Sequence, residues 1–205
     1  LEKPPVRGGR IIPLEAYGVK LISLGFLMDR DAPVIWRGPI IMKVITQFLN
    51  DVEWSGLDYL IVDLPPGTGD AQLSLVQTTQ VAGGLIVTTP QEMAVGDALR
   101  GAKMFERVQV PVLGVIENMS GMTLPSGERI DLFGSGGGRR LADELGVPLL
   151  AQVPLQPGMT EHADRGRPIV VAEPESAAAL VLREVAGRIA EAVERQAPRT
   201  PILRG

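Results

Sequence analysis

The chain has 205 residues, of which 45% are hydrophobic, and its formal net charge at pH 7 is −4. This length suits one domain with its own core, and the hydrophobic content excludes a disordered chain. The acidic balance gives no electrostatic reason to expect a nucleic-acid partner, which would favour a basic face. No apolar run approaches the roughly 18–20 residues of a membrane span, so we predict no membrane partner either.

The residues before position 52 predict loops, one strand and one helix. Residues 1–19 are rich in proline and glycine and predict loop, with residues 11–13 at most an edge strand. Residues 19–24 predict a strand, and residues 29–33 predict a turn. A helix is predicted over residues 40–51, because its apolar side chains recur at the i, i+3, i+4 spacing of one buried face: Ile41, Val44, Ile45, Phe48 and Leu49.

From residue 59 onward, strand and helix signals alternate. The predicted strands are 59–64, 84–89, 112–118 and 149–153, with a short extended piece at 169–171. The predicted helices are 70–81 with Asp70 as its cap, 91–108, 136–145 ending at Gly146, and 176–195. Continuous apolar strands that alternate with helices are typical of an α/β fold, in which a mostly parallel sheet has helices on both faces.

A binding site is predicted at one edge of this sheet. Ligands of such sheets bind at the carboxyl ends of the strands. Asp63, Thr88, Asn118 and Pro154 lie at or just after four of these ends. We therefore expect these residues to surround a common site.

The run from Asp63 to Asp70, D-L-P-P-G-T-G-D, is the most informative part of this edge. An acid at the end of a buried strand, followed by a Pro-Gly turn, is how many phosphate-hydrolysing α/β proteins hold magnesium and sense a γ-phosphate. The N–H of Gly67 can approach a phosphate because no side chain blocks it. The alternative interpretation is a plain strand-end turn with Asp70 as a helix cap.

Two other features invite a functional interpretation that we do not favour. Residues 134–138 are glycine-rich like a phosphate cradle, but they lack the spacing and the following lysine, so we interpret them as a loop that lets a helix begin close to its neighbour. Arg139 and Arg140 follow this loop, and we expect both side chains to be exposed to solvent. The only histidine, His162, is expected to be a solvent-facing helix residue.

Six motifs in order resemble the Mrp/ApbC family of P-loop ATPases, which are relatives of MinD and are regarded as iron–sulfur cluster carriers. The motifs are W-R-G-P at 36–39, W-S-G-L-D-Y at 54–59, the run at 63–70, T-P-Q at 89–91, E-N-M-S at 117–120 and F-G-S-G-G-G at 133–138. The resemblance covers residues from about 17 to about 192. It implies one MinD-like nucleotide-binding domain, which we place at 1–196, followed by a tail at 197–205.

The resemblance also implies roles for single residues. Asp63 would be the Walker B-type carboxylate near Mg²⁺, acting through water, and Gly67 would face the γ-phosphate of ATP. Asn118 would hydrogen-bond the adenine edge, and the segment around Pro154 would line the base pocket. The resemblance further implies a homodimer, apo iron–sulfur proteins or assembly factors as partners, and a cytoplasmic location, which the lack of cysteine also fits.

The sequence departs from the family pattern in two ways. The family's glycine-rich phosphate loop, of the form G-K-G-G-V-G-K-S/T, does not occur in it, so we expect the chain to correspond to the C-terminal two-thirds of the family domain. We assign no catalytic base, because upstream groups would place the attacking water. The family's C-x-x-C is also missing, and residues 121–129 hold no cysteine at the equivalent place. We therefore predict that the chain does not bind a [4Fe–4S] cluster in the family's way.

Three functional hypotheses follow from these observations. The first is an ATP-hydrolysing cluster carrier or assembly factor. The second is a nucleotide-gated interaction switch of the MinD or ParA type, which the missing cysteines favour. In the third, the chain is an inactive fragment without a phosphate loop. The mixture of arginine and glutamate in the helix predicted at 176–195 argues against membrane docking in the second case.

Overall fold

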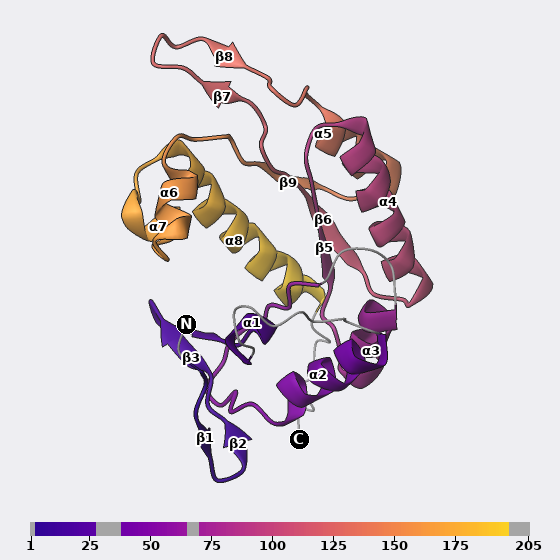
Figure 1. Cartoon of the computed structure of the whole chain (residues 1–205). Helices are drawn as coiled ribbons and strands as arrows, with labels where there is room; N and C mark the ends of the chain where they lie inside the picture. The colour runs from indigo at the N-terminus through magenta and orange to yellow at the C-terminus, as the bar shows by residue number, and fades with distance from the viewer. Residues whose placement is uncertain (1–2, 28–37, 65–69, 197–205) are drawn as a thin grey trace, which may run out of the picture. The chain divides into compact units, whose positions relative to one another are not determined.

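The computed structural model describes residues 3–27, 38–64 and 70–196 (Figure 1). The contacts within the chain divide it into two compact units, Leu1–Gln80 and Val81–Gly205. We call them the first and the second unit. The single domain expected over residues 1–196 stays a prediction, and the tail expected at 197–205 lies outside the described residues.

The first unit begins with two antiparallel hairpins where the sequence predicts loop. β1 (Val6–Arg7) pairs with β2 (Arg10–Ile11), and β3 (Leu14–Ala16) pairs with β4 (Val19–Leu21). Each hairpin turns through two residues with positive φ, Gly8–Gly9 in the first and Tyr17–Gly18 in the second. Such two-residue turns match the twist of paired strands. The prediction for residues 1–19 is therefore wrong, because a Gly-Gly pair is a hairpin signal as well as a loop signal.

Three helices complete the described part of the first unit. They are α1 (Leu24–Leu27), α2 (Gly38–Asn50) and α3 (Asp70–Thr78), and α2 packs against α3. α2 confirms the helix predicted from apolar periodicity, and Asp70 is the first residue of α3. The strand predicted at 19–24 is shorter than expected, because α1 replaces its end. The turn predicted at 29–33 lies outside the described residues.

The strand predicted at 59–64 does not form. These residues belong to no strand, and they are mostly exposed, with Ile61 86% accessible to solvent. A buried parallel strand needs hydrogen-bonding partners on its flanks, and no strand in the described ranges pairs with this segment. The prediction was wrong because an apolar run specifies a buried strand only where neighbouring strands are in place.

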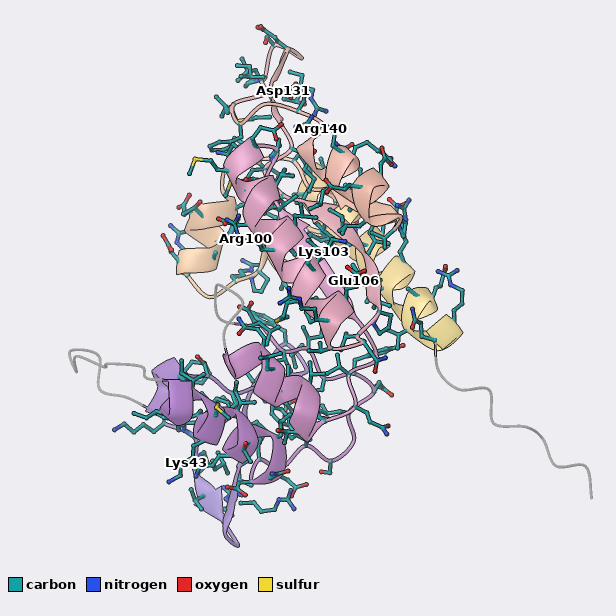
Figure 2. The ribbon with its side chains drawn as sticks, turned by 90° about the vertical axis from the view of Figure 1, so that its right-hand side faces the viewer. Lys43, Arg100, Lys103, Glu106, Asp131 and Arg140 are labelled. Carbon is teal, nitrogen blue, oxygen red and sulfur yellow. The ribbon has the colours of Figure 1, made fainter. Side chains whose placement is uncertain are left out.

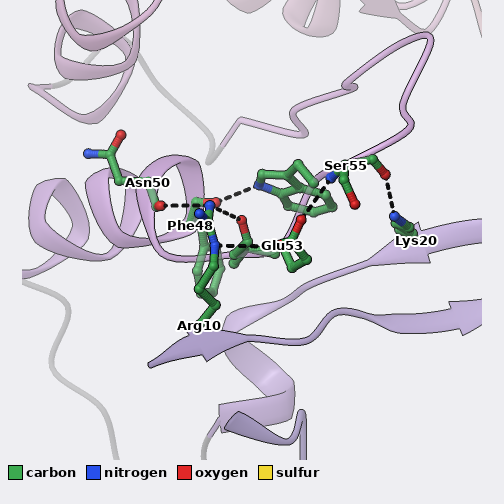
Figure 3. Close-up of polar contacts among 8 residues, drawn as sticks. Arg10, Lys20, Phe48, Asn50, Glu53 and Ser55 are labelled. Carbon is green, nitrogen blue, oxygen red and sulfur yellow. Dashed lines mark hydrogen bonds and ion pairs between the residues drawn. The ribbon is translucent and has the colours of Figure 1, made fainter. Parts of the chain in front are cut away.

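Arg10 connects the first hairpin to the end of α2 (Figure 3). Its Nη2 donates to the backbone oxygens of Asn50 at 3.3 Å and Val52 at 3.2 Å, and its Nε lies 3.1 Å from Oε2 of Glu53. The carbonyls at a helix end lack partners inside the helix, and a cation there also opposes the helix dipole. A hydrogen bond from Ser55, and then the charge of Arg10, hold the pKa of Glu53 below its ordinary value.

Replacing Arg10 by methionine is expected to destabilise the first unit by about 1 kcal/mol, because two carbonyls lose a charged donor at a half-exposed site. Urea unfolding followed by tryptophan fluorescence would measure this, since both tryptophans, Trp36 and Trp54, belong to the first unit. Arg7→Met is the matched control, because Arg7 is exposed in the same hairpin. Equal midpoints for the two variants would contradict the role given to Arg10.

The second unit is a parallel sheet with helices on both faces, as predicted. β5 (Gly84–Thr88), β6 (Val112–Glu117) and β9 (Leu149–Gln152) pair in the order β5-β6-β9. Figure 1 shows α4 (Glu92–Arg107) and α5 (Gly137–Leu145) on one side of this sheet and α8 (Ala177–Gln196) on the other. The most deeply buried apolar side chains lie between these layers: Val115, Leu141, Ala142, Ala178 and Ala179.

The helices of this unit separate a buried face from a charged one. On α4, Ala102, Met104 and Phe105 are buried, whereas Figure 2 shows Arg100, Lys103 and Glu106 on its outer surface. Lys103 pairs with Glu106 at 2.9 Å. On α5, Arg139 and Arg140 are exposed as expected, and Arg140 pairs with Glu92. These charged side chains keep the outer faces of the helices hydrated, so they do not indicate a binding site.

Three elements of the second unit differ from the prediction. Residues 169–172 form a short helix, α7 (Ile169–Ala172), and not an extended piece. Pro168 is its N-cap, and the backbone oxygen of Pro168 accepts hydrogen bonds from the N–H groups of Val171 at 2.8 Å and Ala172 at 2.9 Å. The hairpin of β7 (Met122–Thr123) with β8 (Arg129–Ile130) was not predicted, whereas α6 (Met159–Asp164) confirms that His162 lies in a helix. The side chain of His162 is less exposed than expected, because it is 22% accessible to solvent and its Nε2 lies 2.9 Å from Oε1 of Glu173. In the described ranges, no helix is both long and apolar enough to cross a bilayer.

Candidate functional site

The carboxyl ends of β5, β6 and β9 meet at one edge of the sheet, as the parallel topology requires. The backbone N–H of Asn118 donates to Thr88 O at 2.7 Å, which joins the ends of β6 and β5. The N–H of Val153, the residue before Pro154, donates to Glu117 O at 2.8 Å, which joins the ends of β9 and β6. The structure therefore brings the predicted positions Thr88, Asn118 and Pro154 to one rim.

Asn118 lies half-buried in a short loop that follows β6. Its side-chain oxygen accepts a hydrogen bond from the N–H of Met119 at 2.9 Å, and Met119 has a φ of +56°. The loop borders an open pocket of about 300 Å³ that polar and small side chains line: Val87, Thr88, Thr89, Ala94, Asp97, Ala98 and Asn118. An amide with both donor and acceptor atoms at such a place can read the edge of a planar ring.

The remaining predicted site residues are Asp63, Gly67 and Pro154. Asp63 is an exposed carboxylate of the first unit and lies outside any strand. Gly67 lies outside the described residues, so its contact with a γ-phosphate stays a prediction. Pro154 is half-buried just after β9, and the next residue, Leu155, donates its N–H to Gly121 O at 2.8 Å. The loop after β6 and the segment after β9 are thus bonded to each other.

Glu117 makes the most side-chain hydrogen bonds on this rim, although its sequence pattern did not single it out as a site residue. It has no solvent exposure. Its Oε1 accepts hydrogen bonds from Ser120 Oγ at 2.8 Å and Gln152 Nε2 at 2.7 Å, and its Oε2 accepts one from the Gly138 N–H at 2.6 Å. We call Glu117 and these three donors the Glu117 network. The sequence signal that could have indicated its role is an acidic residue at the last position of the apolar strand β6.

The Glu117 network depends on the close approach of α5 to the sheet. An alanine Cβ at Gly138 would lie 2.6 Å from Glu117 Cβ, and one at Gly137 would lie 2.2 Å from the backbone oxygen of Pro90. Gly136, at the N-cap of α5, has a φ of +73°. These contacts confirm the prediction that residues 134–138 let a helix begin close to its neighbour.

Electrostatics favour the ionised form of Glu117. Burial alone raises the pKa of this carboxyl group, but the hydrogen bonds from Gln152, Gly138 and Ser120 and the charge of Arg129 together outweigh burial and hold the pKa below its ordinary value. The amino end of α5 adds a dipole that attracts an anion. The Glu117 carboxylate is therefore neutralised by groups of the protein itself and is not accessible to a ligand.

The β7–β8 hairpin contacts the same loop. Arg129 of β8 donates from Nη2 to Ser120 O at 3.1 Å and from Nε to Asp131 Oδ1 at 3.0 Å. The hairpin covers residues 122–130, which hold no cysteine, and no group of three or more His, Cys, Asp or Glu in the described ranges could hold a metal ion. The side chains present therefore do not fit an iron–sulfur cluster.

A family model described as ParA, NUBPL iron-transfer P-loop NTPase, matches residues 2–190. The chain belongs to this family. This membership confirms the resemblance drawn from the six motifs. It also agrees with the parallel sheet and flanking helices of the second unit.

Curated relatives of this NUBPL-type chain are similar over most of its length. An iron–sulfur cluster carrier protein of Synechocystis is 53% identical over 90% of the chain and 53% of its own length. A mitochondrial iron–sulfur protein required for NADH dehydrogenase in Arabidopsis thaliana is 42% identical over 94% of the chain and 62% of its own length. The chain thus spans between about half and two-thirds of these two relatives.

Solved structures agree with the fold of the NUBPL-type family. A nucleotide-binding protein of Archaeoglobus fulgidus, solved in complex with ADP, is 34% identical and superposes with a TM-score of 0.68 over 85% of this chain and 67% of that one. The cell-division ATPase MinD of Pyrococcus furiosus is 22% identical, with a TM-score of 0.55 over 76% of this chain and 59% of its own. The second likeness concerns the fold alone.

Proposed function

We propose that the chain binds and hydrolyses ATP with Mg²⁺ as an Mrp/ApbC-type protein that serves iron–sulfur cluster assembly. The observation that carries this proposal is the ordered rim at the ends of β5, β6 and β9, where Asn118 lies beside the segment of Pro154. Family membership supports it, and so does the ADP complex of the Archaeoglobus fulgidus relative.

Within this proposal, four residues have separate roles. Asn118 reads the adenine edge, and the segment at Pro154 lines the base pocket. Asp63, an exposed carboxylate with the hard oxygen atoms that Mg²⁺ prefers, holds the ion through water. The Gly67 N–H faces the γ-phosphate. Magnesium neutralises charge on the phosphates, and the protein contributes mainly positioning, so no residue here is assigned as a base.

An iron–sulfur cluster enters this proposal only as cargo. The 205 residues contain no cysteine, so thiolates from outside these residues must hold the cluster, and we propose that a partner supplies them. The partners are then a second copy of the chain and apo iron–sulfur or assembly proteins, in the cytoplasm. Stable, stoichiometric [4Fe–4S] reconstitution on the purified protein alone would contradict this part of the proposal.

Calorimetric titration with ATP and Mg²⁺, using protein expressed from its whole open reading frame, tests the proposal. We expect saturable binding and slow ATP hydrolysis. Hydrolysis without any effect on cluster delivery to an apo protein would favour the nucleotide-gated switch, a hypothesis that the missing cysteines support. If ATP does not bind, the hypothesis of an inactive fragment is the one that remains.

Asp63→Asn is expected to lower the rate of ATP hydrolysis about 100-fold, because the ion that stabilises charge in the transition state loses its carboxylate. The fold should not change, since Asp63 is exposed. Phosphate release under saturating ATP measures the effect. Asp58→Asn is the control, because Asp58 is an exposed carboxylate of the same segment. A wild-type rate in Asp63→Asn would remove Asp63 from the site.

A further inference from the structure

Glu117 is a fully buried charge whose three hydrogen-bond donors are all neutral. Burying a carboxylate costs free energy that such bonds offset but seldom exceed, and an apolar side chain of similar size would fill the same space. The placement of the donors is therefore informative. They come from the start of α5, from the loop after β6 and from the end of β9.

These bonds fix the loop that carries Asn118 on both sides. Before Asn118, Glu117 is held by its strand pairing and by Val153, whose N–H donates to Glu117 O at 2.8 Å. After Asn118, Ser120 donates from Oγ to Glu117 at 2.8 Å and from its N–H to Val153 O at 2.9 Å. Between these anchors, Met119 adopts a φ of +56°, which a non-glycine residue keeps only where its surroundings impose it.

We propose that Glu117 is a positioning residue for nucleotide recognition, which holds the loop of residues 118–120 so that the Asn118 amide meets the edge of a purine base. This inference rests on the proposed function, because it assumes that Asn118 reads the base. Glu117 itself touches no nucleotide. Its carboxylate sets the position of the amide through Ser120, and the start of α5 and Gln152 set the position of the carboxylate.

Glu117→Gln tests this role with the least change of shape. The amide keeps one acceptor oxygen and replaces the other by a donor, so at least one of the three bonds in the Glu117 network is lost. We expect the affinity for ATP with Mg²⁺ to fall about tenfold, the effect of losing one charged hydrogen bond, in protein from its whole open reading frame. The affinity for inorganic tripolyphosphate, which has no base, should not change.

Glu128→Gln is the matched control, because Glu128 is an exposed carboxylate in the turn of the β7–β8 hairpin. It should leave both affinities unchanged. Ser120→Ala removes one donor and keeps the carboxylate, so a smaller loss, about threefold for ATP alone, is expected. This second variant decides the question if circular dichroism shows that Glu117→Gln does not fold.

The comparison of ATP with tripolyphosphate separates positioning from general stability. Equal losses for both ligands, or no loss for either in a folded variant, would overturn the inference and leave the proposed function intact. A wild-type protein that binds neither ligand would overturn the proposed function, and the inference with it. A loss confined to ATP in Glu117→Gln and Ser120→Ala is the result that supports the inference.

Discussion

Replacing Gly137 by alanine is expected to lower the free energy of unfolding of the second unit by about 3 kcal/mol. The new Cβ would lie 2.2 Å from the oxygen and 2.8 Å from the carbonyl carbon of Pro90. Both are backbone atoms, so no rotation of a side chain relieves the overlap. α5 has to move away from the loop after β5, and the fully buried Leu141 of α5 moves with it.

Gly101→Ala provides the control for this substitution. Gly101 lies within α4, and an added Cβ would meet nothing within 4 Å. Because alanine is the better helix former, we expect a gain of up to about 1 kcal/mol. Urea unfolding followed by far-ultraviolet circular dichroism compares the two variants. Equal free energies of unfolding for Gly137→Ala and Gly101→Ala would show that the close approach of α5 is not needed.

Glu117→Ala is expected to destabilise the second unit by about 3 to 4 kcal/mol at neutral pH. The substitution leaves the buried donors of Ser120 and Gly138 and the exposed amide of Gln152 without their acceptor, and it opens a cavity at a site with no solvent exposure. The same denaturation experiment measures the loss. Glu128→Ala, at an exposed position, should cost far less, and equal losses would contradict the role of the Glu117 network.

The pH dependence of this difference gives a second readout. The pKa of Glu117 is lowered in the folded protein, so its stabilising effect is complete above the ordinary glutamate value of 4.5 and is lost as the pH falls through the lower folded value. Between neutral pH and that range, the difference between wild type and Glu117→Ala should be constant. Below that pH range, the difference in stability should shrink, because the wild type loses the stabilisation by ionised Glu117 that the variant already lacks.

The sheet of the second unit could be predicted because its signals are local. The apolar runs at 84–88, 112–117 and 149–152 specify buried strands, and the helices between them follow from periodicity and from a C-cap such as Gly146, whose φ is +66°. The segment at 59–64 carries an equally good local signal and forms no strand. A strand exists only with its partners, and their presence is not encoded in the run itself.

The candidate site was predictable where it depends on topology. Parallel strands bring Asn118 and Pro154 to one rim whatever their side chains do, so their common location followed from the parallel direction of the strands. The Glu117 network was not predictable, because two of its donors, Gly138 and Gln152, are 21 and 35 residues away in the sequence. Hydrogen bonds of that range depend on the approach of α5, which only the folded chain reveals.

The exposed segment from Tyr59 to Val62 also bears on the behaviour of the chain in solution. Four consecutive apolar residues of high β propensity are open to solvent. Such runs promote self-association into intermolecular sheets. Asp58 and Asp63 bracket the run with negative charges on both sides, which is how natural sequences keep such segments apart. Asp63 would then act as a solubility gatekeeper whenever no metal ion engages it.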